Sequence, residues 1–201
     1  MSLIKKSQRQ QAYARRKAQC HKDELSRVIC QQFSQHAAYQ HATTLLVYLH
    51  CRSEVRTLEF VKTQLKNDKK IIIPYCTHDE HGHPKLGLWR LTDLNELVAG
   101  TWGILEPPKE HWLNPLKTIN PQQLDLIMVP GVAFTQQGAR LGNGAGYYDR
   151  LLNQVRTDCI LMAIAYESQV VKVLEMNPHD VYMNFVLTEK KCYTGCFSRK
   201  C

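Results

Sequence analysis

The chain has 201 residues, of which 44% are hydrophobic and 22% are charged, and its formal net charge is +8. These values exclude wholesale disorder, and they fit a single domain over residues 1–201 that buries a core without disulfides or metals. Residues 1–6 lack the apolar stretch of a signal peptide and no apolar run is long enough to cross a bilayer, so we expect a cytoplasmic protein with reduced cysteines and no membrane partner.

The chain opens with a basic segment that is predicted to form a helix over residues 3–19. At about 100° per residue, Lys5, Arg9 and Arg16 fall on one face of this helix. Such a row of charges is typical of a solvated helix face. The net charge also allows an acidic partner, and it does not distinguish nucleic acid from a nucleotide or an acidic small molecule.

The rest of the chain alternates between buried strands and amphipathic helices. Short apolar runs rich in strand formers predict the strands, and apolar residues at helical spacing predict the helices. In chain order we expect a helix whose first turn holds Asp23 and Glu24, a strand at 43–49, a helix at 57–66, a strand at 69–74 ended by Pro74, a polar turn at 77–85, a strand at 86–91, an irregular segment at 95–121, a strand at 124–130, a helix at 147–154, a strand at 159–166 and a last strand at 185–188. This alternation predicts an α/β fold with a mostly parallel sheet covered on both faces.

The segment between the strand at 124–130 and the helix at 147–154 is rich in glycine. Its Gly142-x-Gly144-x-Gly146 spacing is neither a dinucleotide fingerprint nor a P-loop, so tight turns and a phosphate cradle are equally consistent with it. Arg140 favours the cradle, because a guanidinium beside bare backbone amides can bind phosphate oxygens bidentately. We expect it to be an exposed loop arginine with little packing to lose. We therefore expect the chemistry here, at the carboxyl end of a parallel strand.

Side chains on either side of this segment have two readings each. Tyr147 and Tyr148 could stack on a planar ring, or one of them could pack in the core. Asp149 lies in the first turn of the expected helix, where a carboxylate interacts favourably with the helix dipole; beside a polyphosphate it could instead hold Mg²⁺. Asp180, in a turn that looks exposed, offers a second carboxylate.

The cysteines and histidines form no recognised metal pattern. Cys76, His78, His81 and His83 are metal ligands by type, but their spacing fits no common zinc site and their segment reads as a polar turn. Three further cysteines, Cys192, Cys196 and Cys201, form a loosely spaced tail. No Ser/His/Asp or Cys/His nucleophile arrangement can be singled out.

The chain closely resembles the 5-formyltetrahydrofolate cyclo-ligase (5,10-methenyltetrahydrofolate synthetase) family over nearly its whole length. The resemblance rests on the ordered central motif Pro130-Gly131-x-x-Phe134 with Gly138-x-Arg140-Leu141-Gly142-x-Gly144-x-Gly146-Tyr147-Tyr148-Asp149, and on Lys5-x-x-x-Arg9, Leu49 with Glu54, Trp102-Gly103-Ile104-x-Glu106-Pro107, Pro178-His179-Asp180 and Leu187-Thr188-Glu189. An ordered motif of this length is far more specific than glycine spacing alone.

The resemblance implies a three-layer α/β/α sandwich and an ATP- and Mg²⁺-dependent closure of 5-formyltetrahydrofolate to 5,10-methenyltetrahydrofolate, with release of ADP and phosphate. The catalytic cations it implies are Lys5, Arg9 and Arg140. For ATP it implies these three with Leu141, Gly142, Asn143, Gly144, Ala145, Gly146, Tyr147 and Tyr148, and for Mg²⁺ Asp149 and Asp180. For the folate, with or without a polyglutamate tail, it implies Leu49, Glu54, Trp102, Phe134, Asn143, Gly144, Ala145, Gly146 and Tyr147.

Three positions depart from the family's usual pattern, namely Asn143, Ala145 and Asn184. The resemblance favours a monomer that acts on a small molecule and binds no nucleic acid. Two alternatives stay open from the sequence: a basic nucleic-acid-binding protein, and an ATP-binding relative with another substrate.

Overall fold

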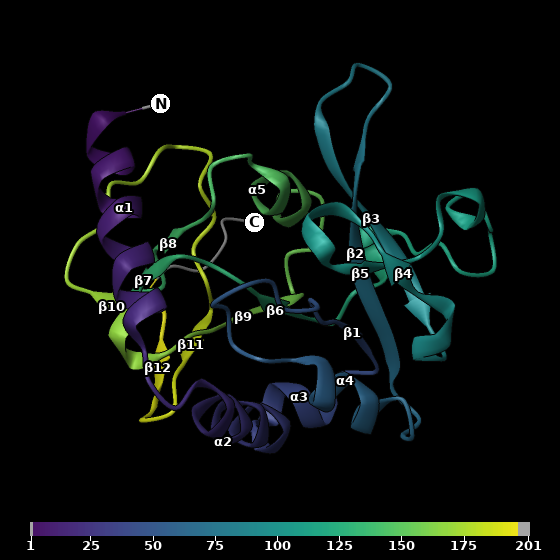
Figure 1. Ribbon diagram of the computed structural model, residues 1–201, viewed down its shortest axis with the longest axis horizontal. Helices are drawn as coiled ribbons and strands as arrows, with labels where there is room; N and C mark the ends of the chain where they lie inside the picture. Colours follow the sequence, from purple (N-terminus) through teal and green to yellow (C-terminus); the bar gives the residue numbers. More distant parts are fainter. Residues whose placement is uncertain (1, 197–201) are drawn as a thin grey trace.

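The computed structural model describes residues 2–196 and has a seven-stranded sheet at its centre, in the order β12-β11-β9-β6-β1-β2-β3 (Figure 1). Five neighbouring strands run parallel: β1 (Thr44–Leu46), β2 (Lys70–His78), β6 (Leu126–Val129), β9 (Ile160–Ile164) and β11 (Phe185–Leu187). The two edge strands, β3 (Pro84–Leu91) and β12 (Cys192–Thr194), are antiparallel to their neighbours. The expected α/β class with a mostly parallel sheet is confirmed.

Helices cover both faces of this sheet. Successive side chains of a strand point to opposite faces, so Leu45 and Ile71 pack on the side of α2 (Lys22–Gln35), α3 (Ala37–His41) and α4 (Leu58–Gln64), whereas Leu46 and Ile72 pack on the side of α5 (Tyr147–Leu152). Figure 1 shows these two layers below and above the sheet. Side chains buried on both sides explain why the strands read as continuous apolar runs.

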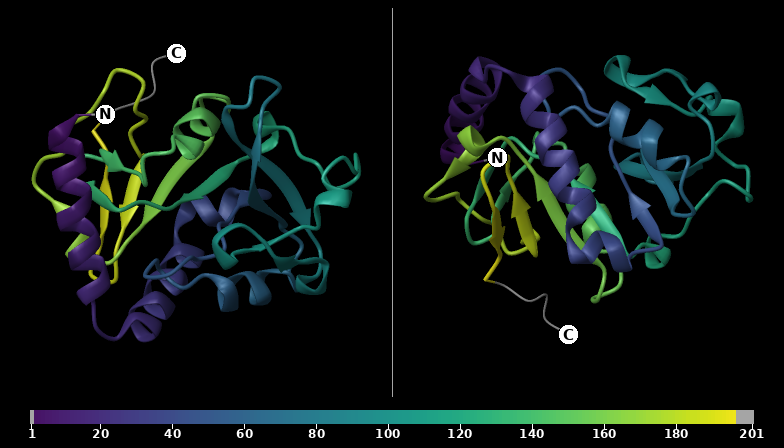
Figure 2. Two further views of the ribbon diagram at one scale, coloured as in Figure 1. Left: turned by 45° about the horizontal axis from the view of Figure 1, so that its top comes forward. Right: turned by 90° about the horizontal axis from the view of Figure 1, so that it is seen from below.

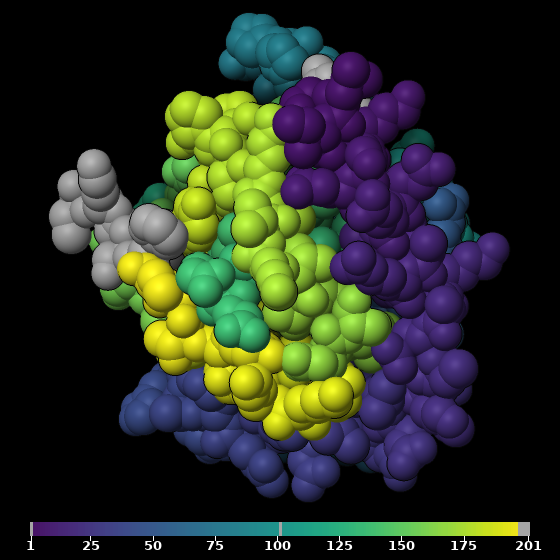
Figure 3. Space-filling view, turned by 90° about the vertical axis from the view of Figure 1, so that its left-hand side faces the viewer, coloured from purple at the N-terminus to yellow at the C-terminus, as the bar shows by residue number. Residues whose placement is uncertain are grey.

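The first helix, α1 (Leu3–Ala18), lies outside these layers. It packs through Ala12 on a second, three-stranded sheet made of β10 (Val170–Val171), β7 (Ala133–Thr135) and β8 (Arg140–Leu141). Figure 2 shows the helix along this side of the molecule, and Figure 3 shows it beside the segments that follow β9. The second sheet was not expected from the sequence. It places α1 against the connection that carries the glycines.

The end of β2 and the start of β3 differ from the expectation. Pro74 does not end β2, which continues to His78 and pairs with β3 as far as Pro84. Ile72 accepts a hydrogen bond from Val47 on the β1 side, and by the two-residue period Pro74 faces the same side, where β1 has already ended. A residue without an N–H is tolerated at such a position. The expected polar turn at 77–85 is therefore only the tip of a hairpin.

The expected cysteine tail also contains structure, because Cys192–Thr194 forms edge strand β12. Between β3 and β6 the chain forms short 3₁₀ helices at Leu94–Glu96, Thr101–Gly103, Lys109–His111 and Pro121–Gln123, with a two-stranded ladder of β4 (Val98–Ala99) and β5 (Leu105–Glu106). Another 3₁₀ helix, Glu167–Gln169, precedes β10. Within residues 2–196, no helix combines the length and apolarity that crossing a membrane requires.

Candidate active site

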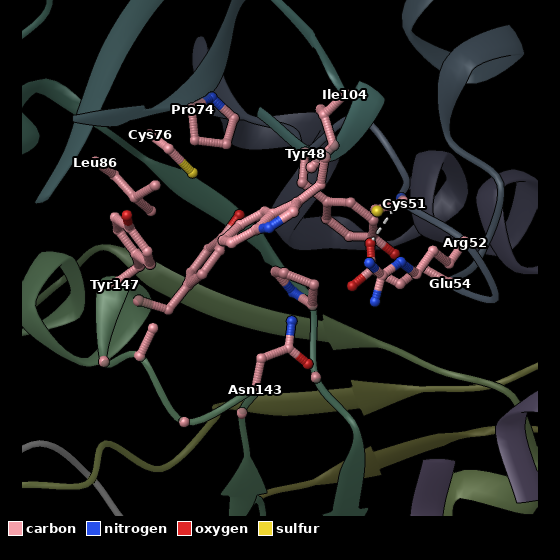
Figure 4. Close-up of a pocket in the computed structure, with 18 of the residues that line it drawn as sticks. Tyr48, Cys51, Arg52, Glu54, Pro74, Cys76, Leu86, Ile104, Asn143 and Tyr147 are labelled. Carbon is pink, nitrogen blue, oxygen red and sulfur yellow. Dashed lines mark hydrogen bonds between the residues drawn. The ribbon is translucent and has the colours of Figure 1, made fainter. Parts of the chain in front are cut away.

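A cavity of about 370 Å³ opens beyond the carboxyl ends of β1 and β6 and against the second half of β2 (Figure 4). Its size is that of a small-molecule site, and its position is where ligands of parallel α/β sheets bind. Four parts of the chain line it: the segment after β1, the β2–β3 hairpin with the long connection that follows, the glycine segment, and the inner face of α1.

The segment after β1 supplies Tyr48, Leu49, Cys51, Arg52 and Glu54 to the cavity. Arg52 has a left-handed φ of 53°, which turns the chain back sharply. The turn lets the Cys51 amide donate to Glu54 Oε2 at 2.9 Å. Burial raises the pKa of the Glu54 carboxyl, while this hydrogen bond and the charge of Arg16 act to lower it. Leu49 and Glu54, expected from the sequence to meet the substrate, both line the cavity.

The facing wall comes from the hairpin and the long connection, and its lining residues are Pro74, Cys76, Leu86, Trp102, Ile104 and Glu106. Trp102 is 60% exposed with a left-handed φ of 58°, so its indole stands at the mouth of the cavity. Glu106 is buried, and the Cys76 amide donates to its Oε1 at 3.4 Å. The sequence reasoning missed Cys76 in this role, because it ended the strand at Pro74.

The glycine segment forms the floor, with Gly142 to Asp149 and Arg140 all lining the cavity. Gly144 and Gly146 have φ values of +102° and +73°, a backbone conformation that side-chain-bearing residues rarely adopt. A Cβ on Gly142 would lie 2.9 Å from Arg140 Nη1, so glycine allows the guanidinium to sit directly under the loop. Tight-turn glycines and a cradle over a cation are thus present in the same segment.

Arg140 is buried, contrary to the expectation of an exposed loop arginine. Only 6% of the residue is exposed, because it lies in β8 under the glycine segment. Its Nη2 donates to Asp149 Oδ1, and its Nη1 donates to the Pro130 carbonyl at 3.3 Å. Among the described residues, Arg140 Nε and the Tyr148 hydroxyl are two of the three buried side-chain polar atoms without a hydrogen-bond partner. Burial raises the pKa of the Tyr148 hydroxyl, so it stays protonated and can only donate or accept as a neutral phenol.

Lys5 and Arg9 contact the glycine segment and its surroundings from behind and do not line the cavity. Arg9 Nε donates to the Gly142 carbonyl at 2.8 Å. Lys5 Nζ donates to Asp180 Oδ2 at 2.5 Å. Asp180 is mostly buried, not exposed, with 11% of its side chain accessible. Desolvation acts to raise its pKa, but the hydrogen bonds from Lys5 and from the Asn177 amide prevail and lower the pKa of this carboxyl.

Two residues of α1 that sequence reasoning did not assign to the site line the cavity. The Tyr13 hydroxyl donates to Asn143 Oδ1 at 2.6 Å, and the Arg16 guanidinium lies over the Tyr13 ring and 3.7 Å from Glu54 Oε1. The signal for Arg16 was present in the sequence, because this residue shares a helix face with Lys5 and Arg9. That face is turned inward and is not solvated.

Two expected contact residues lie elsewhere. Phe134 is fully buried, and its ring packs so closely under Gly131 that a Cβ there would come within 2.4 Å of Cζ. Leu141 is also buried and packs in the cluster beneath α1 with Ala12. Neither lines the cavity, so the expectation that Phe134 forms an apolar wall for the substrate is corrected: the exposed aromatic surface comes from Trp102 and the tyrosines.

The remaining candidates have structural contacts. Asn184 accepts a hydrogen bond from the Leu161 amide at 2.7 Å, which ties two strands together. His81 and His83 lie in the exposed hairpin tip, where His83 Nδ1 is 3.2 Å from Asp79 Oδ2. In the part of the chain that the structure describes, no group of three or more His, Cys, Asp or Glu side chains could hold a metal ion. Cys201 lies outside the described residues.

The carboxylates nevertheless suit a magnesium ion, which keeps most of its waters and needs only one or two protein carboxylates. Asp149 lines the cavity with 29% of its side chain exposed, and its ion pair with Arg140 engages Oδ1, which leaves the second oxygen for a cation. The turn that carries Asp180 packs against α5, because Asn153 Nδ2 donates both to the Asp149 carbonyl at 2.8 Å and to the His179 carbonyl at 3.3 Å. Because Asp149 lines the cavity and Asp180 does not, Asp149 is the better placed of the two to hold a cation there.

Comparisons with known proteins agree on one family. Residues 2–189 match the model of the 5-formyltetrahydrofolate cyclo-ligase family. The chain is 34% identical over 148 residues to a Mycolicibacterium smegmatis 5-formyltetrahydrofolate cyclo-ligase, covering 74% of each protein, and 28% identical to the mouse protein of that name, covering 82% of each. Among solved structures, Aquifex aeolicus 5,10-methenyltetrahydrofolate synthetase superposes with a TM-score of 0.81 at 27% identity, covering 99% of this chain and 96% of that one.

Proposed function

The chain belongs to the 5-formyltetrahydrofolate cyclo-ligase family, and from that premise we propose that it is an ATP- and Mg²⁺-dependent enzyme that converts 5-formyltetrahydrofolate to 5,10-methenyltetrahydrofolate and releases ADP and phosphate. One observation carries this proposal: a single cavity has an acidic group, Glu54, on one wall, and its floor is the glycine segment, which lies over a buried cation, Arg140. A folate ring with N–H donors suits the Glu54 wall, and a phosphoryl group suits the glycine floor.

At the glycine end, binding of the ATP phosphates rests on backbone amides and on arginine charge. Arg140 lies under the floor, and Arg9 holds the Gly142 carbonyl from the other side, so the loop is fixed between two guanidiniums. Preorganised positive charge of this kind stabilises the charge that develops on a transferring phosphoryl group. Lys5, paired with Asp180 in this structure, would join the phosphates by exchanging that partner.

At the other end, Glu54 would accept hydrogen bonds from the pterin, between the apolar surfaces of Leu49 and Trp102. The cavity places this carboxylate and the glycine floor in one continuous volume. The formyl oxygen would attack the γ-phosphate, with ADP as the leaving group. N10 would then add to the activated formyl carbon and lose its proton, and the C–O bond would break to release phosphate. No protein nucleophile is needed, because the side chains act by positioning the two substrates and by neutralising phosphate charge.

Magnesium would be held by Asp149, with Asp180 as a second carboxylate once Lys5 is released, and would neutralise phosphate charge. We also propose a cytoplasmic enzyme that acts as a monomeric single domain. Free thiols at Cys51 and Cys76 inside the cavity suit a reducing compartment.

The rival hypothesis of a nucleic-acid-binding protein rested on the net charge and the basic first helix. In the structure, Lys5, Arg9 and Arg16 face Asp180, Gly142 and Glu54, so the face that motivated it is not presented to a partner. An ATP-binding relative with another substrate would keep the glycine floor and differ at the Glu54 wall. This second alternative is decided by the substrate test that follows.

The test is to mix purified protein with 5-formyltetrahydrofolate, ATP and Mg²⁺ and to follow the absorbance of the methenyl product together with ADP release. We expect both signals to appear in equal amounts and to vanish without ATP. ATP consumption without methenyl product, or intact ATP and folate, would refute the proposal. Omitting Mg²⁺ in the presence of a chelator tests the metal requirement separately.

A further inference from the structure

We propose that Arg16 is a positioning residue for the folate wall: it fixes the Glu54 carboxylate toward the cavity from α1, an element that the sequence reasoning connected only with ATP. This inference rests on the proposed function for the identity of the ligand. The Arg16–Glu54 contact itself is a property of the free protein, so the two can fail separately.

The geometry singles out Arg16 among the basic residues of α1. It is only 3% exposed, although arginine is seldom fully buried without partners. Its Nε donates to the Ser53 hydroxyl at 3.0 Å, and its Nη1 donates to the Gly131 carbonyl at 3.0 Å and lies 3.7 Å from Glu54 Oε1. One side chain therefore joins α1, the segment after β1 and the segment after β6. These are three of the surfaces that meet at the cavity.

Arg52 on the same segment and Arg140 under the floor also line the cavity, but Arg16 is the cation that pairs with Glu54. Glu54 is 9% exposed, and the groups whose pKa it influences are neutral or acidic: Tyr48 just after β1, Cys51 on its own segment, and Tyr148 on α5. Burial raises its pKa, whereas the Cys51 amide and Arg16 act to lower it, and Arg16 is the only charge among the described residues that does so. Arg16 favours the ionised form, and that form accepts hydrogen bonds from a substrate.

This arrangement gives Arg16 a role that differs from that of Lys5 and Arg9. Those residues contact the glycine segment and Asp180, away from Glu54. Loss of Arg16 should therefore weaken folate binding and leave ATP binding nearly unchanged. A residue needed only for folding would lower stability without separating the two substrates.

The experiment compares Arg16→Met, which keeps the volume and removes the charge, with Arg16→Lys, which keeps the charge. Arg15→Met is the matched control, because Arg15 is an exposed neighbour on the same helix. In the free proteins, carbon-13 NMR of labelled glutamate side chains follows the titration of Glu54, identified by its absence in Glu54→Gln. We expect the Glu54 pKa to rise in Arg16→Met, to return toward the wild-type value in Arg16→Lys, and to be unchanged in Arg15→Met.

Steady-state kinetics give the second readout. In Arg16→Met at neutral pH, we expect the KM for 5-formyltetrahydrofolate to rise about tenfold, the size of losing one hydrogen bond to a charged group, with the KM for ATP within about twofold. Arg16→Lys should recover most of this loss, and adding Arg16→Met to Glu54→Gln should raise the KM for 5-formyltetrahydrofolate no further.

An unchanged Glu54 titration, or equal effects on the KM of both substrates, would overturn the inference. If wild-type protein fails to turn over, the proposed function fails, and the NMR titration still decides the Arg16–Glu54 contact. If Arg16→Met does not fold, the titration and KM of Arg16→Lys decide it, since a displaced ammonium should shift both in the same directions by less.

Discussion

Arg140 and Asp149 show how single charges are held at this cavity. The arginine is buried and the aspartate is partly exposed, so their ion pair connects the interior to the open floor. Removing Asp149 should cost more than removing Arg140, because the first change leaves a desolvated guanidinium, whereas the second leaves a carboxylate that water can reach. Arg140 also donates to the Pro130 carbonyl, so it joins β8 to the end of β6. The fold around the cavity therefore depends on Arg140, and so does phosphate binding if the proposed function holds.

Arg140→Ala should lower both turnover and stability. We expect turnover to fall by a factor of about 100 or more, the size of losing one preorganised charge at a phosphoryl site. The free energy of unfolding should fall by about 2 kcal/mol, less than for a fully buried pair because Asp149 is partly hydrated. Urea unfolding and the methenyl assay measure the two effects, with exposed Arg15→Ala as the control. An unfolding midpoint equal to that of wild type would show that the ion pair adds nothing to stability.

The residue types at this site could be predicted from the sequence, whereas the burial of Arg140 could not. The residues around it read as a polar, glycine-rich loop, and burial depends on a hairpin, β7–β8, whose two strands are only a few residues long. Arg16 was missed for a related reason. A row of cations on a helix has the same pattern whether it faces solvent or a carboxylate from a distant segment, and only tertiary packing decides between them.

At the level of elements, the parallel strands were found because their apolar runs are long enough to be distinct. Strand β12 and the end of β2 were not predicted, since they contain cysteine, histidine and proline and are paired on one side only. Polar contacts outside the core also hold the starts of β1, β6 and β9 together, and we call the contacts of Asp125 described next the Asp125 clamp. Asp125, just before β6, accepts hydrogen bonds from the Thr43 and Thr44 amides, each at 2.8 Å, and from the Thr43 hydroxyl at 2.7 Å, and it pairs with Arg156 ahead of β9.

This clamp predicts a pH-dependent contribution to stability. Desolvation acts to raise the Asp125 pKa, but the hydrogen bonds from Arg156 and Thr43 prevail and hold it well below its ordinary value of 3.8. Because the folded-state pKa is depressed, the contribution is fully present above pH 3.8 and is lost as the pH falls below that value toward the folded-state pKa.

The variant that tests this is Asp125→Asn. At pH 7 it should lower the free energy of unfolding by about 1–2 kcal/mol, given that the carboxylate is partly exposed. The difference from wild type should narrow when the pH is lowered below 3.8. Denaturant unfolding at a series of pH values measures both. A difference that stays constant down to the lowest pH at which the proteins fold would contradict the ionic origin of the clamp.

Across the whole molecule, α1 is attached mainly by polar contacts to segments from the other end of the chain. Ser2 donates to Glu175 at 2.6 Å, Lys5 pairs with Asp180, and Arg9 binds Gly142. The apolar contribution is small, since Ala12 is the helix's one residue in the cluster beneath it. Contacts across such sequence distances leave no periodic signal, which is why the fold class could be read from the sequence and the place of α1 could not. A helix held in this way should respond to a ligand that engages the same polar groups.

We therefore expect a non-hydrolysable ATP analogue with Mg²⁺ to slow amide hydrogen exchange in residues 3–18 and 140–149 together. Nucleotide that binds only the folded state stabilises it by RT ln(1 + [L]/Kd), about 2.7 kcal/mol at a hundredfold excess over Kd, and local openings that release the bound groups are suppressed by the same amount. Helix α3 (Ala37–His41), which packs on the opposite face of the main sheet from α5, serves as an internal control. Arg9→Met should reduce the protection of residues 3–18 more than that of residues 140–149. Protection confined to residues 140–149 would mean that α1 takes no part in nucleotide binding, and Lys5 and Arg9 would then have only the structural contacts that join α1 to the rest of the chain.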